Sequence, residues 1–252
     1  MKMRSSLTIR VVHPPTQEDP FLVVEKPSSL PSSPLFEGQD SALTQAVRLF
    51  PQLDAVRGKK AVERGLLHRL DTAARGLLLI AATQHSYDVL SAAQSRGEFC
   101  KSYSAHCSFL PKEKRAVMQG FPPPPVDITR EAVTSCGVNI TLCSRFRHWG
   151  ANGRWSRPVT ERSGSAALKK CSPVLYETLI SLRSASGEIL ADCSIARGFK
   201  HQVRCHLAWL GFPVAGDELY NPLDGAGGQL AFCATTVSFP HPITGQPVVI
   251  TL

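Results

Sequence analysis

The 252-residue sequence lacks several features that would place it in common classes of protein. Its eight cysteines include no Cys-x-x-Cys pair, so the closely spaced ligands of a structural zinc site are missing. No apolar run approaches the roughly 20 residues that cross a bilayer, and no secretory segment follows the N-terminal Lys2 and Arg4. The sequence therefore predicts a cytoplasmic protein with reduced cysteines, no metal and no membrane association.

Nucleotide-binding signals are also absent, because neither a P-loop nor a Rossmann glycine pattern occurs. We therefore expect no cofactor. Charged residues make up only 19% of the chain and apolar residues 43%, a composition that excludes extended disorder. The net charge is +8, which suits a polyanionic partner.

Hydrophobic periodicity predicts an α+β domain dominated by sheet. We expect helices at 41–50, 83–96 and 201–210. Strands are expected at 21–24, 76–82, 101–110, 138–143, 175–182, 188–195, 229–239 and 247–252. Residues 1–18 are interpreted as an extension and residues 19–252 as one domain, with a basic inserted loop at about 145–172.

Asp71 is the first candidate for chemistry. It ends a His-Arg-Leu-Asp segment that begins at His68, so a carboxylate follows an apolar stretch and lies next to Arg69. An ionised, oriented aspartate is what a covalent or electrostatic role at a sugar C1′ requires. Asp71 could equally cap the following turn or pair with Arg69.

A second group of polar side chains lies at the start of the helix expected at 201–210. His201 and Arg204 are one helical turn apart, and Gln202 lies between them. These donors indicate a phosphate- or carboxylate-binding face, with an ordinary solvated helix face as the alternative. In the strand expected at 101–110, Lys101 and Tyr103 share a face, and they could hold a phosphate and stack on a base, unless the tyrosine is simply core.

The inserted loop is the most basic part of the chain. Residues 145–170 contain seven basic side chains against a single acidic one. Cations interleaved with aromatic rings favour single-stranded nucleic acid, although a solvated, flexible loop would have the same composition. The arginines concerned are Arg145, Arg147, Arg154 and Arg157, and the rings are Phe146, Trp149 and Trp155.

In this order, the motifs resemble the RluA family of pseudouridine synthases from about residue 20 to the end of the sequence. The motifs are Glu25-Lys-Pro27, His68-Arg-Leu-Asp71, Lys101-Ser-Tyr103, His201-Gln-Val-Arg204-Cys-His206, Gly216-Asp-Glu-Leu-Tyr220 and Phe239-Pro-His-Pro-Ile-Thr-Gly245. The resemblance implies a mixed, largely antiparallel central sheet flanked by helices, with the active site in a central cleft. With its first motif at Lys26, the chain resembles the short members that lack an S4 domain.

The resemblance also implies residue roles. Asp71 matches the essential aspartate, Tyr103 the active-site tyrosine and Arg204 the arginine that pairs with that aspartate, with Arg69 as further support. The implied substrate is a specific uridine of rRNA or tRNA, handled by a monomer without an obligatory protein partner. Whether the aspartate acts at C1′, at C6 or through a glycal stays open.

Departures from the family pattern occur at Ala74, Arg75, Phe199 and Cys233, and they bear on the substrate more than on activity. Two other functions compete with the synthase. A retaining glycosidase would need a second carboxylate, for which Glu63 and Glu98 are candidates. A non-catalytic RNA-binding protein could retain the same scaffold.

Overall fold

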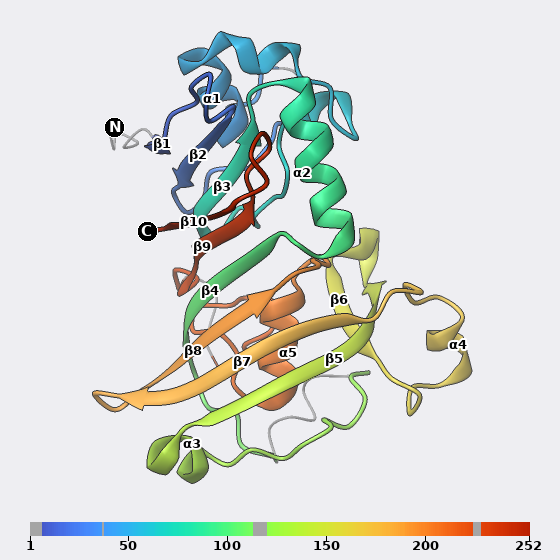
Figure 1. Ribbon diagram of the computed structural model, residues 1–252. Coiled ribbons are helices and arrows are strands. Elements are labelled where there is room, and N and C mark those ends of the chain that lie inside the picture. Colours follow the sequence, from blue (N-terminus) through green and yellow to red (C-terminus); the bar gives the residue numbers. More distant parts are fainter. Residues whose placement is uncertain (1–6, 37, 113–119, 224–227) are drawn as a thin grey trace, which may run out of the picture. The chain divides into compact units, whose positions relative to one another are not determined.

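The computed structural model describes residues 7–36, 38–112, 120–223 and 228–252, and these form two compact units (Figure 1). Unit 1 contains residues 1–102 and 233–252, and unit 2 contains residues 103–232. Within the described part of the chain, every helix is too short or too polar to span a lipid bilayer.

Unit 1 is built on a mixed sheet. Its strand order is β1 (Arg10–His13), β2 (Phe21–Lys26), β3 (Arg75–Ala81) and β9 (Phe232–Pro240), and β10 (Pro247–Thr251) pairs with β9. β3 and β9 run parallel, whereas β1 with β2, β2 with β3, and β9 with β10 run antiparallel. The apolar runs of β2 and β3 are buried throughout. Both strands contribute to a hydrophobic core in which the rings of Phe21 and Phe99 each pack edge to face on Phe239.

Local capping explains the helices of unit 1. α1 (Ala42–Leu49) begins at Ser41 and α2 (Gln84–Arg96) at Thr83, each with a reciprocal capping box. Gly97 ends α2 in the left-handed conformation at φ 85°. α2 packs alongside β3 (Figure 1), as its apolar face predicts. Short 3-10 helices at Pro51–Ala55 and Ala61–Glu63 precede the Asp71 segment.

Unit 2 is an antiparallel sheet in the order β8 (Glu188–Ile195), β7 (Tyr176–Ala185), β5 (Val138–Trp149) and β6 (Trp155–Val159). α5 (Gln202–Leu210) packs against β6 and β7, and the short helices α3 (Arg130–Cys136) and α4 (Ser165–Leu168) lie at its periphery (Figure 1). β4 (Cys100–Cys107) begins in unit 1 and ends in unit 2. The expected α+β class with a mixed, largely antiparallel sheet is confirmed.

Two boundaries differ from the sequence expectation. Part of the expected extension, residues 10–13, forms β1, which pairs with β2 in the part of the chain that the structure describes. Residues 145–149 and 155–159, expected within a loop, form strands of a β-hairpin. Alternation persists through β5, with Ser144 and Phe146 inward and Arg145 and Arg147 outward, but the charged outward positions concealed it.

Candidate active site

Asp71 lies half-buried in a turn that enters β3. The turn closes with the Ala74 amide donating to the Asp71 carbonyl over 3.0 Å. On the other side of Asp71, Ser32 Oγ donates to the Leu70 carbonyl at 2.8 Å and accepts from the Leu70 amide at 2.9 Å. Leu70, the residue before Asp71, is thus fixed through its backbone atoms.

Lys26 fixes the same turn from beneath. Its side chain is fully buried, and its ammonium donates to the carbonyls of Thr72 at 3.2 Å and Ala74 at 2.6 Å. It also donates to the carbonyls of Pro27 and Leu30 at 2.9 and 2.7 Å. Burial lowers the Lys26 pKa to about 8, although the negative charge of Asp71 raises it. The Glu25-Lys-Pro27 motif was recognised in the sequence, but no role was assigned to Lys26. The backbone carbonyls that accept its hydrogen bonds cannot be identified from a sequence.

Gly76 allows the turn to approach β9. Its φ of +123° is one that L side chains rarely adopt, and a Cβ here would overlap the backbone of Ala234. Gly76 and Ala234 are register partners in the parallel pairing of β3 with β9. Position 76 therefore requires glycine for two reasons: the Ala234 backbone lies too close for a Cβ, and the φ angle disfavours any other residue.

Arg69 and the glycosidase candidates form exposed ion pairs in the structure. Arg69 Nη1 lies 3.1 Å from Glu63 Oε1. The structure therefore pairs Arg69 with Glu63, and not with Asp71 as one alternative from the sequence had it. Glu98 pairs with Arg96 at 2.7 Å, and the Arg96 hydrogen bond lowers the Glu98 pKa. A glycosidase acid needs the opposite shift, which argues against Glu98 in that role.

Lys101 lies in a buried cluster, and its expected contact with a phosphate stays a prediction. Its side chain is 4% exposed, and its ammonium lies 4.9 Å from the centre of the Phe99 ring. The His68 ring packs against Phe99 at 5.3 Å. Burial lowers the Lys101 pKa to about 8, and burial together with the Lys101 charge lowers the His68 pKa to about 3.

Replacing Lys101 with methionine is expected to stabilise the fold at pH 7, because desolvation of the buried ammonium opposes folding. Burial lowers the Lys101 pKa from 10.5 to about 8, so the methionine variant should have a free energy of unfolding up to about 3 kcal/mol higher than wild type. Between pH 8 and 10.5, Lys101 is neutral in the native state and still protonated in the unfolded state, so the wild type gains stability as pH rises. The difference in stability between Lys101→Met and wild type therefore shrinks.

Urea unfolding at pH 7 and at pH 10 measures that difference, with Lys59→Met as the matched control at an exposed position. A Lys101→Met protein that is less stable than wild type at pH 7 would contradict the desolvation argument.

In unit 2, the Tyr103 ring is 7% exposed and stacks on Phe232 with centroids 5.0 Å apart. One face of the ring is therefore occupied within unit 2. Base stacking by Tyr103, its relation to Asp71 and the expected central cleft stay predictions.

The helix expected to present a polar face is buried along its whole length. Gln202 is 2% exposed, and its amide group donates to the Glu177 carbonyl at 2.8 Å and to Thr178 Oγ1 at 3.0 Å. His206 is enclosed between Ser144 and Thr178, both at 2.9 Å, and burial lowers its pKa to about 3. Gln202 is thus a buried residue with hydrogen-bonding partners in unit 2, and its expected contact with RNA stays a prediction.

His201 and Arg204 have specific partners within unit 2. His201 adopts the left-handed conformation (φ 58°) just before α5, and its Nδ1 lies 3.1 Å from Tyr220 Oη. Arg204 forms a two-bond ion pair with Asp217, at 2.8 and 2.6 Å. Asp217 was not predicted as a site residue, although it stands in the quoted Gly216-to-Tyr220 motif.

The basic segment forms a surface on the β5–β6 hairpin, called here the arginine hairpin, which carries Arg145, Arg147, Arg154 and Arg157. Arg147 and Arg157 are cross-strand register partners, and their guanidinium carbons lie 4.6 and 3.5 Å from the centre of the Trp149 ring. Within the described ranges, none of the four arginines forms an ion pair. Burial and the Arg147 charge lower the Arg157 pKa.

The aromatic residues of the arginine hairpin differ from expectation. Phe146 is fully buried and stacks on Phe199 at 5.2 Å, so it is core. Trp149 is covered by two guanidinium groups. Trp155 is the most exposed of the three rings, at 37%. The Phe199 departure thus fills the core beside Phe146.

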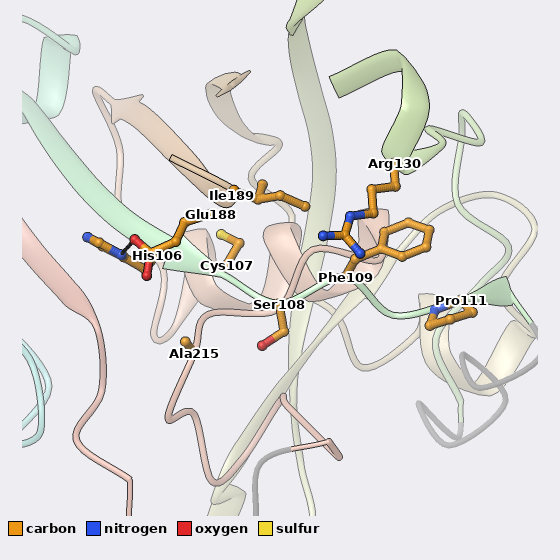
Figure 2. A pocket seen from close by; sticks show the side chains of 10 residues that line it. His106, Cys107, Ser108, Phe109, Pro111, Arg130, Glu188, Ile189 and Ala215 are labelled. Atoms are coloured by element: carbon orange, nitrogen blue, oxygen red, sulfur yellow. Dashed lines mark ion pairs between the residues drawn. The ribbon is translucent and has the colours of Figure 1, made fainter. Parts of the chain in front are cut away.

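A cavity of about 430 Å³ in unit 2 has none of the predicted site residues among the residues that line it (Figure 2). Its walls carry Arg130 and an exposed ion pair of His106 with Glu188 at 3.0 Å. Cys107 faces the same cavity, and burial raises the pKa of its thiol to about 12, so the thiol is not a ready nucleophile. In the described part of the chain, no group of three His, Cys, Asp or Glu side chains is arranged to hold a metal.

The fold and these side chains define an α+β protein in which hydrogen bonds fix the turn that contains Asp71 and a basic surface is suited to nucleic acid. Residues 20–209 match the family model described as RNA pseudouridylate synthase, and the chain belongs to that family.

Curated relatives and solved structures agree with this assignment. The chain is 26% identical over 242 residues to ribosomal large subunit pseudouridine synthase D of Zymomonas mobilis, covering 92% of this chain and 66% of the relative. It is 26% identical over 234 residues to the dual-specificity RNA pseudouridine synthase RluA of Escherichia coli, covering 91% and 87%. Its fold matches human RNA pseudouridylate synthase domain containing 1, with a TM-score of 0.63, 19% identity and coverage of 100% and 86%.

Proposed function

We propose that this chain is an RNA pseudouridine synthase with Asp71 as its catalytic aspartate. The observation that carries the proposal is the Asp71 turn, whose backbone is fixed by Lys26 and Ser32 and which places Asp71 at a half-buried position before β3. Family membership supplies the reaction class. The chain spans 66% of the length of the Zymomonas mobilis relative, and the activity is therefore offered as a proposal.

The reaction is an isomerisation that balances without an oxidant or an energy source. The N1–C1′ bond of uridine breaks, the uracil turns, and C5 bonds to C1′. The C5 hydrogen leaves to solvent while N1 takes up a proton. The base must leave its stack first, which costs a few kcal/mol.

We assign Asp71 to the reacting nucleotide, Tyr103 to stacking on the base and Arg204 to keeping the carboxylate ionised. The substrate class we propose is a structured rRNA or tRNA, bound by a cytoplasmic monomer. All eight cysteines are free thiols, which supports a reducing compartment.

The test uses cellular RNA carrying tritium at uridine C5. Release of tritium by the wild type supports the synthase. RNA binding without release would instead favour a binding protein that retains the scaffold.

The arginine hairpin is proposed to hold the RNA backbone. Arg147 and Arg157 repel each other across the two strands and share one indole, so a phosphate placed between them relieves that repulsion. We expect Arg147→Gln with Arg157→Gln to weaken RNA binding about 10- to 100-fold at low salt. The salt slope should also fall by roughly 2, one counterion for each lost phosphate contact.

Filter binding across a salt series measures both quantities, and Arg183→Gln is the matched control, because Arg183 is half-exposed on β7 and pairs with Asp192. An unchanged salt slope in the double variant would remove the hairpin from the RNA-binding surface.

A further inference from the structure

The most exposed aromatic side chain that the structure describes is Phe36, which is 65% exposed. The preceding Leu35 is 80% exposed, so two large apolar side chains lie next to each other on the surface of unit 1. The segment before them is different, because Leu30 and residues 32–34 are buried. An adjacent apolar pair of this kind indicates a contact surface, whereas exposed apolar residues scattered singly do not.

The loop that carries Leu35 and Phe36 is closed at its base and braced at its tip. At the base, the Ala42 amide donates to the Pro31 carbonyl at 2.8 Å. At the tip, the Leu35 amide donates to Gln39 Oε1 at 2.6 Å, and the Gln39 amide donates to the Phe36 carbonyl at 3.2 Å. These bonds hold the backbone in a shape that keeps both apolar side chains on the surface, although their burial would be favourable.

The base of this loop is fixed to the turn that contains Asp71, within the same unit. Ser32 Oγ donates to the Leu70 carbonyl at 2.8 Å and accepts from the Leu70 amide at 2.9 Å. Phe36 follows Ser32 by four residues, and a fully extended chain of that length spans at most about 14 Å. An RNA whose uridine reaches Asp71 therefore has its neighbouring nucleotides within reach of Phe36.

We propose that Phe36 stacks on a nucleobase that flanks the target uridine of the RNA substrate, with Leu35 packing beside it. The proposal rests on the proposed function, in which Asp71 acts on that uridine. A uridine that leaves its stack uncovers the faces of the neighbouring bases, and an aromatic ring can cover such a face whatever the base is. The competing possibility is that the apolar pair docks a protein, in which case it has no contact with RNA.

The test is tritium release from C5-labelled cellular RNA in a single turnover, at protein concentrations below saturation. Phe36→Ala is expected to lower the rate about 10- to 100-fold, because loss of one stacking ring has an effect of that size. Phe36→Trp should stay within about 3-fold of wild type, since an indole also stacks on bases. Leu49→Ala, at a 56% exposed apolar position on α1, is the matched control and should keep the wild-type rate.

Ultraviolet cross-linking to the same cellular RNA measures the contact without turnover. We expect the peptide that contains Phe36 to carry cross-linked nucleotides, both in wild type and in Asp71→Asn, because the Asp71 side chain takes no part in the stacking. The cross-linked positions should lie beside uridines that the wild type converts to pseudouridine.

Thermal unfolding guards against a folding defect, and Phe36→Ala should unfold at the wild-type temperature because its ring is mostly exposed. A wild-type rate in Phe36→Ala, an equal loss in Phe36→Trp, or a Phe36 peptide without cross-links would overturn the proposal. An altered oligomeric state of Phe36→Ala with unchanged RNA contact would assign the pair to protein docking instead. If the wild type releases no tritium, the synthase falls, and cross-linking alone decides whether Phe36 contacts RNA bases.

Discussion

Asp71→Asn is expected to reduce tritium release from C5-labelled RNA by at least about 10³-fold, because the amide cannot be ionised and cannot act as nucleophile or base. The fold should tolerate the change. The turn is held through the backbone carbonyls of Thr72 and Ala74 and through Leu70, and none of these bonds uses the Asp71 side chain. RNA affinity should stay within about 3-fold of wild type, since the arginine hairpin is untouched.

Asp88→Asn is the matched control for this experiment. Asp88 lies on α2 in the same unit and accepts a hydrogen bond from Gln84 at 3.0 Å, so the chemical change is the same at a position without a proposed role. Both variants are compared with wild type in one assay, with circular dichroism as the check of folding. Release that persists in Asp71→Asn would assign the chemistry to another residue.

Gly76→Ala is expected to destabilise unit 1 by about 2–5 kcal/mol. The left-handed φ costs about 1–2 kcal/mol for any residue with a Cβ. Overlap with the Ala234 backbone adds about 1–3 kcal/mol, because a strand backbone moves less readily than a side chain. Strain at Gly76 would also displace the turn that holds Asp71.

Gly245→Ala separates the two contributions. Gly245 has φ +71° and open space where its Cβ would be, so only the conformational cost of about 1–2 kcal/mol is expected. Chemical unfolding of both variants gives the comparison. Equal losses for Gly76→Ala and Gly245→Ala would show that the approach of β3 to β9 is not tight.

Local signals in the sequence predicted α1, α2 and α5, whereas the short helices α3 and α4 were not predicted. α2 was expected at 83–96 and is observed at Gln84–Arg96, because a capping threonine at one end and a left-handed glycine at the other are encoded within a few residues. β6 was not predicted, because five residues that include Arg157 and Pro158 have no clear alternation and obtain their strand character from pairing with β5.

The candidate site was less accessible to sequence reasoning than the fold. Periodicity placed His201 and Arg204 on a polar face. Arg204 and its neighbour Gln202 are instead buried by partners distant in sequence, namely Asp217 for Arg204 and Glu177 and Thr178 for Gln202. A sequence pattern records that a side chain is polar, but not whether a buried partner satisfies it. Lys26 was overlooked for a related reason, since its acceptors are backbone carbonyls.

The discontinuity of unit 1 has a consequence for synthesis on the ribosome. Residues 103–232 separate its two segments, and β9, the parallel partner of β3, comes from the second. Unit 2 is continuous and has all its strands from β5 to β8 before residue 233 is translated. A nascent chain therefore completes the sheet behind Asp71 late, and until then the β3 edge is open to chaperones, to a neighbouring nascent chain on the same polysome, and to proteolysis.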